Sequence, residues 1–407
     1  MNSQYVKFFR ESIIALGITV FGELITGSLW GSFYAKFILI AGIIALIPVI
    51  SENRGNISGI FTSRLGTGLH LGSIKPSLTK RTKELNNTIL MNIVLTLSLP
   101  VWTSLVVFTF FTVGGGSTTF FQFFLIAFGT AFILVFVQPI LTVLISFIVY
   151  RKGLDPDVVV YPVTSVIADV LTTIALYISV SIEVSFFPTS NTDIIEKVVE
   201  LTVLTYFLIL LVIVFSRKFR NRVKITFEFL DLLKESLPII MISIMIGATV
   251  GIILNNQITD ASILLILPIY MSFTGAVGSI IGSKFTTSYY LGSLSTNRGK
   301  IEMYISSPLI LIIVGMFLST ALGIVAFNIS SYLNFSLANS VTIVNYVLSC
   351  ILIGIVTTSM AIVLALTLGN VSFKWNLDAD NVIIPLSTTL GDLIAILSVI
   401  GITSILF

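Results

Sequence analysis

The chain has 407 residues, of which 56% are hydrophobic and 10% are charged. Soluble domains carry about a quarter charged residues, so this composition excludes a soluble globular protein and predicts an exterior that faces lipid. The net charge of +3 gives no indication of a nucleic-acid partner, and the single Cys350 and single His70 exclude an intrachain disulfide and a Cys- or His-based metal centre.

Apolar runs long enough to cross a bilayer core recur along the whole chain. Such a crossing takes about 20 residues of helix. In chain order the runs are 11–30, 36–51, 87–111, 119–150, 158–182, 197–216, 236–254, 261–282, 304–328, 340–371 and 382–406. The sequence therefore predicts an all-α polytopic membrane protein with about eleven transmembrane helices, whose first partner is the lipid bilayer.

The distribution of Lys and Arg predicts the orientation. With the N-terminus in the cytoplasm, every basic residue except Lys36 and Lys197 falls on the cytoplasmic side, including Arg54, and none falls within a span. This bias is what the positive-inside rule requires. We expect a multi-pass protein of the plasma membrane with a cytoplasmic N-terminus and an external C-terminus.

The two halves of the chain repeat each other. Pro48 matches Pro268 at an offset of 220 residues, and the run from Asp157 to Asp169 matches the run from Asp380 to Asp392 without gaps. The repeats are predicted to be five-helix units at 1–182 and 225–407, joined by a linker at 183–224 that contains the connecting span. An odd connecting helix keeps both repeats in the same orientation, which predicts a pseudo-two-fold axis along the membrane normal.

Two acidic residues fall inside predicted spans at equivalent positions. Asp169 and Asp392 each lie twelve residues, or about 18 Å of helix, after Asp157 and Asp380. This depth is near the middle of a bilayer core, where a charge by default marks an ion pathway. A pair of carboxylates at the axis suits a hard dication that keeps much of its water, as Mg²⁺ does. The alternative is a structural ion pair, which the lack of Lys or Arg within any span disfavours.

Smaller polar residues accompany these acids. Ser165 and Thr388 lie one turn before them, where their hydroxyls would either face the ion or serve ordinary helix packing. Gly55 and Asn56 are expected to break or cap a helix where the second span reaches the cytoplasm. The Asn56 amide would there face a hydrated cation or cap a polar loop. Glu23, inside the first span, has no assigned role.

Two spaced motifs resemble a known family. Gly55-Asn56-Ile57 followed by Ser63-Arg64-Leu65, and Asp380-Asn381 followed by Gly391-Asp392, resemble the signatures of solute-carrier family 41. Both motifs are also similar to segments of the membrane domain of MgtE-type magnesium channels. That domain has five spans and functions as a homodimer. The resemblance implies a pore lined by the second and fifth spans of each repeat, with magnesium held by Asp169 and Asp392 and with Asn56 nearby. Candidate secondary cation contacts are Asp157, Asp380 and Asn381.

The sequence also departs from this pattern. Ala276 stands where the second repeat should carry the amide of Asn56, and Val158 stands where the first should carry the amide of Asn381. Each half has thus lost one amide, which predicts an asymmetric site. No soluble region precedes the first span, so the magnesium-sensing domains of bacterial relatives are expected to be absent.

These observations predict divalent cation transport, with Mg²⁺ as the transported ion, through a central pathway between the repeats. One chain is expected to hold a complete pore, and a higher oligomer is left open. The alternatives are a Na⁺-coupled Mg²⁺ exchanger, with Na⁺ as coupling ion, a transporter of another divalent cation, and an intramembrane aspartyl enzyme. Transport is preferred to enzymatic activity, and no cofactor is expected.

Overall fold

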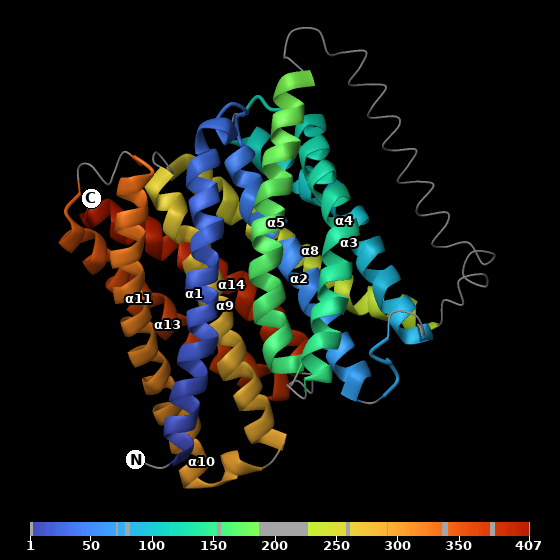
Figure 1. Ribbon diagram of the computed structural model, residues 1–407, viewed down its shortest axis with the longest axis vertical. Helices are drawn as coiled ribbons and strands as arrows, with labels where there is room; N and C mark the ends of the chain where they lie inside the picture. Colours follow the sequence, from blue (N-terminus) through green and yellow to red (C-terminus); the bar gives the residue numbers. More distant parts are fainter. Residues whose placement is uncertain are drawn as a thin grey trace. The chain divides into compact units, whose positions relative to one another are not determined.

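The structure is a computed structural model that describes residues 3–70, 72–77, 82–114, 116–152, 156–186, 227–257, 261–290, 292–335, 341–374 and 379–406. These residues form helices, with no strand among them (Figure 1). The long helices are α1 (Ser3–Phe37), α2 (Ile43–His70), α3 (Lys83–Val113), α4 (Phe120–Arg151), α5 (Pro156–Phe186), α8 (Phe227–Gln257), α9 (Ala261–Tyr290), α11 (Ser307–Tyr332), α13 (Ile343–Lys374) and α14 (Ala379–Leu406). Short elements η1 (Ser293–Ser295), α10 (Asn297–Ile301) and the π-helical η2 (Glu302–Ser306) connect α9 to α11.

The predicted all-α polytopic fold is confirmed. Nine of the predicted spans coincide with long helices, the span at 36–51 overlaps α2 only at 43–51, and the connecting span at 197–216 lies outside the described residues. Within the described chain, eight helices are long and apolar enough to cross a membrane. The eight do not include α2, which carries Glu52, Arg54 and Arg64, or α8, whose apolar part is the shorter stretch Ile240–Asn256.

The second helix differs from its prediction. We expected the span to end near Ser51 and Gly55 to break or cap it, but α2 continues without interruption to His70. The reason is burial: Glu52, Asn53 and Arg54 are each only 6% exposed, so packing in the interior supports helix where composition alone suggests a loop. Local propensity is a weak signal beside tertiary packing.

The chain forms two compact units that do not follow the order of the repeats. One unit comprises residues 1–34 and 253–407, and the other comprises residues 35–252. In the 35–252 unit α2 packs against α3, α4 and α5, and α4 runs alongside both α3 and α5 (Figure 1). In the other unit α9, α11, α13 and α14 form the same set of pairwise contacts. Each unit therefore contains helices two to five of one repeat together with the first helix of the other.

Matched glycines show how the exchanged first helices dock. A methyl group at Gly27 of α1 would overlap the backbone carbonyl of Leu265 on α9, and one at Gly251 of α8 would overlap that of Ala45 on α2. The two contacts are equivalent: Gly251 follows Gly27 by 224 residues, and Leu265 follows Ala45 by 220. Glycine is used at both places because it lets two helix backbones approach closely.

A second pair of glycines marks the ends of equivalent helices. Gly72, after α2, has φ +72°, and Gly292, after α9, has φ +68°. Left-handed glycine is a common way to end a helix, since it lets the next amides bond back to the last turn. Accordingly, the Gly72 N–H donates to the Leu69 carbonyl, and the Gly292 N–H donates to the Tyr289 carbonyl. The repeat seen in the sequence thus extends to the local backbone.

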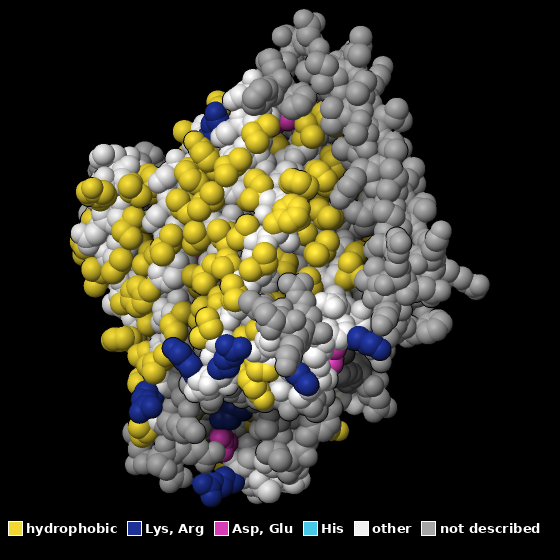
Figure 2. All heavy atoms as spheres, turned by 45° about the vertical axis from the view of Figure 1, so that its right-hand side comes forward, with side chains coloured by type: hydrophobic (Ala, Val, Ile, Leu, Met, Phe, Trp, Pro, Cys, Tyr) yellow, Lys and Arg dark blue, Asp and Glu magenta, His cyan; other side chains and the backbone are white. Residues whose placement is uncertain are grey.

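The outer faces of the helices are apolar. On α1 the exposed residues Ile14, Ile18, Phe21 and Ile25 recur at helical spacing, while Glu23 is fully buried on the other face. Figure 2 shows one face of the molecule, where hydrophobic side chains cover much of the described surface and Lys and Arg lie at its margins. This is the opposite of a soluble surface and is what contact with lipid requires.

The glycine contacts give a stability prediction. Gly27→Ala and Gly251→Ala should each destabilise the protein by about 1–3 kcal/mol, because overpacking a closed contact forces the backbones apart. Gly17→Ala is the matched control, since nothing lies within 4 Å of a methyl group placed at this α1 position. Thermal unfolding in detergent measures the difference. Equal melting temperatures for Gly27→Ala and Gly17→Ala would contradict the close docking of α1.

Candidate functional site

The candidate site in the 35–252 unit centres on a buried ion pair. Arg54, from α2, donates through Nη2 to Oδ1 of Asp169, from α5, at 2.5 Å. The side chains are only 6% and 10% exposed. The second carboxylate oxygen, Oδ2, accepts a long hydrogen bond of 3.5 Å from the Ser165 hydroxyl, one turn earlier on α5. The structure therefore brings Asp169 and Ser165 together as predicted and adds a guanidinium to them.

The presence of Arg54 overturns one expectation from the sequence. We placed Arg54 in a cytoplasmic segment and expected no Lys or Arg within a span, whereas it lies buried in the interior beside Asp169. A signal for this was present in the sequence. Ile47, Ile50, Ile57 and Phe61 recur at helical spacing around Arg54, and all are buried. That spacing places Arg54 on the inward face of α2.

The guanidinium makes a single-point contact with the carboxylate. Among the described residues, Arg54 Nε and Nη1 have no hydrogen-bond partner, although both atoms are buried. Arginine–carboxylate pairs are strongest when two parallel hydrogen bonds form. The Arg54–Asp169 contact thus uses one of the five N–H donors that a guanidinium offers.

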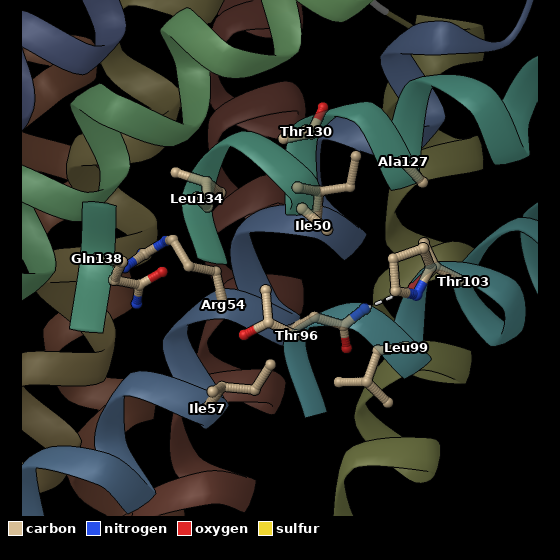
Figure 3. Close-up of a pocket in the computed structure, with 13 residues that line it drawn as sticks. Ile50, Arg54, Ile57, Thr96, Leu99, Thr103, Ala127, Thr130, Leu134 and Gln138 are labelled. Carbon is tan, nitrogen blue, oxygen red and sulfur yellow. Dashed lines mark hydrogen bonds between the residues drawn. The ribbon is translucent and has the colours of Figure 1, made fainter. Parts of the chain in front are cut away.

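A small cavity lies beside this pair (Figure 3). Its volume is about 40 Å³, which is room for more than one water molecule. Its polar lining comes from Asn53 and Arg54 on α2, Thr96 and Thr103 on α3, and Thr130 and Gln138 on α4. Asn53 Nδ2 donates to Thr103 Oγ1 at 2.6 Å, while Asn53 Oδ1 is buried without a hydrogen-bond partner in the described chain. The cavity therefore offers an acceptor that no described donor uses.

Asn56, the predicted amide contact, is also buried. Its Nδ2 donates to Oε1 of Glu52 at 3.1 Å, one turn earlier on α2. Glu23 likewise accepts a hydrogen bond at Oε1, from the Ser272 hydroxyl of α9 at 3.1 Å, within the other unit. Each glutamate thus accepts a hydrogen bond from a neutral donor in the interior.

The equivalent region of the other unit has no arginine. Asp392 and Thr388 lie one turn apart on α14, both half-buried. The segment of α9 that is equivalent to the Arg54 region of α2 packs closely against α14. A methyl group at Gly391 would lie 3.1 Å from the Thr274 side chain. A methyl group at Gly275 would lie 3.1 Å from the Thr388 side chain. Thr274 occupies the position equivalent to Arg54, at an offset of 220 residues. The same helix pair therefore packs with a guanidinium in one half and a threonine in the other.

The remaining predicted contacts stay predictions. Asp157 lies in the first turn of α5, and Asp380 and Asn381 lie in the first turn of α14, but their side chains are outside the described part of the structure. Among the described residues, no group of three or more His, Cys, Asp or Glu is arranged to hold a metal ion.

Comparison with known proteins gives one specific match. The profile of a family described as "MgtE: Divalent cation transporter" matches residues 47–179 and 267–402. The two matched segments begin at equivalent points of α2 and α9 and end inside α5 and α14, so they contain Arg54 and Asp169 in one case and Thr274 and Asp392 in the other. This agrees with two fused copies of one membrane domain.

Other comparisons add little. No curated protein matches the chain. Two solved structures align with this chain over nearly its whole length. The eukaryotic MATE transporter AtDTX14 is 12% identical with a TM-score of 0.34, and the alignment covers 99% of this chain and 96% of that one. An inward-facing multidrug resistance MATE family transporter of the MOP superfamily is 14% identical with a TM-score of 0.31, and the alignment covers 97% of this chain and 98% of that one. Likenesses at this level assign neither fold nor function.

The ion pair predicts unequal effects of neutralising the two aspartates. Asp169→Asn should destabilise the cation-free protein by about 3–5 kcal/mol, because it leaves the buried Arg54 guanidinium without its carboxylate. Asp392→Asn should cost less, since Thr274 stands in place of the arginine. Adding Arg54→Leu to Asp169→Asn should restore much of the loss. Thermal unfolding without divalent cations measures all three, and equal losses for the two single variants would refute the asymmetry.

Proposed function

Because the chain belongs to the MgtE family of divalent cation transporters, we propose that it carries Mg²⁺ across a membrane and that Asp169 and Asp392 hold the ion. The observation that carries this proposal is the equivalence of the two acids. Each lies in the fifth helix of one of the two segments that match the family. The one in the first half is buried in contact with a positive charge, so the interior already contains a cationic group at this carboxylate.

The chemistry of these groups suits magnesium. Mg²⁺ prefers oxygen ligands, loses its water reluctantly, and is often held through one or two carboxylates with several waters retained. Asp169 and Asp392 supply the carboxylates, and the Ser165 and Thr388 hydroxyls lie one turn before each of them. Hydroxyls at this distance along a helix can accept or donate a hydrogen bond to a bound water. The proposed ligand set is thus two carboxylates, with the hydroxyls contacting the hydration shell.

We keep Asn56, Asp157, Asp380 and Asn381 as proposed additional contacts. Asn56 is buried on α2, the helix that also carries Arg54, and its amide already bonds Glu52. The other three lie in the first turns of α5 and α14, twelve or eleven residues before the central aspartates. Their position suits the approach of a hydrated ion to Asp169 and Asp392 along the same helices.

Two alternatives within transport differ in the driving force and in the ion. A Na⁺-coupled exchanger would move Mg²⁺ only while Na⁺ moves down its own gradient in the opposite direction. A transporter of another divalent cation, such as Mn²⁺, would use the same oxygen ligands. Membership in a transporter family favours transport over the aspartyl enzyme that a pair of equivalent acids would also allow. We further propose that one chain is a complete transporter, because it contains two copies of the family's membrane domain.

Flux measurements test the proposal. Purified protein in liposomes should pass Mg²⁺, and both Asp169→Asn and Asp392→Asn should weaken Mg²⁺ binding by about tenfold or more, which corresponds to about 1.4 kcal/mol. Their effects should be non-additive, since both residues are proposed to serve one ion. Glu84→Gln, an exposed acid at the start of α3, is the matched control.

The same preparation separates the alternatives. Flux that appears only with a sodium gradient would identify an exchanger, and preference for Mn²⁺ over Mg²⁺ would change the proposed ion. Normal Mg²⁺ flux and binding in well-folded Asp169→Asn and Asp392→Asn would show that the proposed site is wrong.

The orientation is proposed from the distribution of basic residues: N-terminus cytoplasmic and C-terminus external, in the plasma membrane. Ser73, between α2 and α3, and Val113, at the far end of α3, are both exposed and should lie on opposite sides. In a Cys350→Ser background, an impermeant maleimide added to intact cells should label Val113→Cys and leave Ser73→Cys unlabelled. The reverse pattern would invert the proposed topology.

A further inference from the structure

We propose that Arg54 is an affinity-determining residue of the transporter: its guanidinium competes with the transported dication for Asp169. In the ion-free protein Arg54 occupies the carboxylate, and the arriving cation displaces it toward the neighbouring cavity. This inference rests on the proposed function, because it concerns how the proposed ligand Asp169 is made available.

The first observation is the single-point geometry of the contact. A guanidinium that serves only as a fixed counter-ion is expected to bind a carboxylate through two hydrogen bonds and to find partners for its other donors. Arg54 instead contacts Asp169 through Nη2 alone, while Nε and Nη1 are buried without hydrogen-bond partners in the described chain. Such a pair is held by charge more than by geometry, so a second cation can replace the guanidinium at Oδ1.

The second observation is the space beside the pair. The cavity of about 40 Å³ is lined by Arg54 itself and by Asn53, whose buried Oδ1 is an acceptor with no described donor. Figure 3 shows the Arg54 head group beside the carboxamide of Gln138, which comes from α4. In the displaced state the guanidinium exchanges Asp169 for the carboxamide oxygen of Gln138 and for waters in the cavity. The displaced guanidinium therefore has a polar place to go without leaving the interior.

The third observation is the other half of the chain. The α9–α14 pair is the counterpart of the α2–α5 pair and packs closely with Thr274 at the position of Arg54. A guanidinium is thus not needed to bring these two helices together. Its presence in one half alone is better explained by an effect on the ion than by a requirement of the fold.

Competition would have a clear use. Two carboxylates that both remained free would hold a dication tightly, whereas a transporter must bind its ion weakly enough to release it. If Arg54 covers Asp169 for a fraction of the time, the apparent affinity for the cation falls in proportion to the fraction of protein in which Asp169 is open. Arg54 would in this way set the affinity and favour release, because it returns to Asp169 as the ion departs.

The test is equilibrium Mg²⁺ binding to purified full-length variants. If Asp169 is open for about a tenth of the time, Arg54→Gln should bind Mg²⁺ about tenfold more tightly than the unmodified chain. Arg54→Lys, which keeps the charge, should remain near the unmodified value. Arg64→Gln, which removes a positive charge ten residues further along α2, is the matched control and should change little.

Two further variants keep the proposal testable should Arg54→Gln fail to fold. Thr274→Arg places a second guanidinium at the equivalent position and should weaken Mg²⁺ binding. Arg54→Gln in an Asp169→Asn background should have no effect on affinity, since the residue for which Arg54 competes has lost its charge. Tighter binding in Arg54→Gln that persists in the Asp169→Asn background would overturn the proposal, as would weaker or unchanged binding in Arg54→Gln.

Asp392→Asn separates failure of this inference from failure of the proposed function. If Asp392→Asn weakens Mg²⁺ binding while Arg54→Gln leaves it unchanged, the site stands and Arg54 is a structural counter-ion. If neither variant changes Mg²⁺ binding, the proposed site itself is wrong.

Discussion

The contact between the Arg54 guanidinium and the Asp169 carboxylate is the constraint on which the account of this protein depends. An isolated charge is costly in the interior of a protein that is surrounded by lipid. The charge of each of these two residues is therefore stabilised by the charge of the other. The pair joins α2 to α5 in the interior, at the polar stretch of α2 that burial keeps helical. It also makes Asp169 unlike its counterpart Asp392, so the two halves of the chain are not chemically equal.

This inequality is available only to a fused protein. In a homodimer of a five-helix unit, an arginine on the second helix would appear twice, and both central acids would be neutralised together. Fusion lets each half change independently of the other. Three polar residues of the first half have a different residue at the equivalent position of the second half: Arg54 is matched by Thr274, Asn56 by Ala276 and Glu23 by Gly247. The backbone has meanwhile kept its symmetry, as the close contacts of Gly27 and Gly251 show. Two units with equivalent internal contacts therefore carry different charged residues.

Much of the fold could be predicted because lipid imposes long apolar helices and because the repeat could be checked against itself. The match of the Asp169 and Asp392 segments identified both acids as candidates, and the structure places the Ser165 hydroxyl 3.5 Å from Asp169 Oδ2, while their role at an ion stays a prediction. Arg54 was misplaced because Gly55 and Asn56 beside it favour a loop and because basic residues are usually cytoplasmic. Its partner lies 115 residues away, and only the tertiary structure brings the two together. The exchange of α1 and α8 between the units leaves no periodic signal in the sequence, so it too could be learned only from the structure.

The most direct test of the central claim is an experimental structure of the protein with bound Mn²⁺, whose anomalous scattering locates the ion in place of Mg²⁺. The account predicts the ion at the carboxylates of Asp169 and Asp392, with Arg54 Nη2 moved beyond hydrogen-bond distance of Asp169 Oδ1 and its head group directed toward Asn53 and Gln138. An ion bound elsewhere, or one bound while the Arg54–Asp169 contact stays intact, would contradict it.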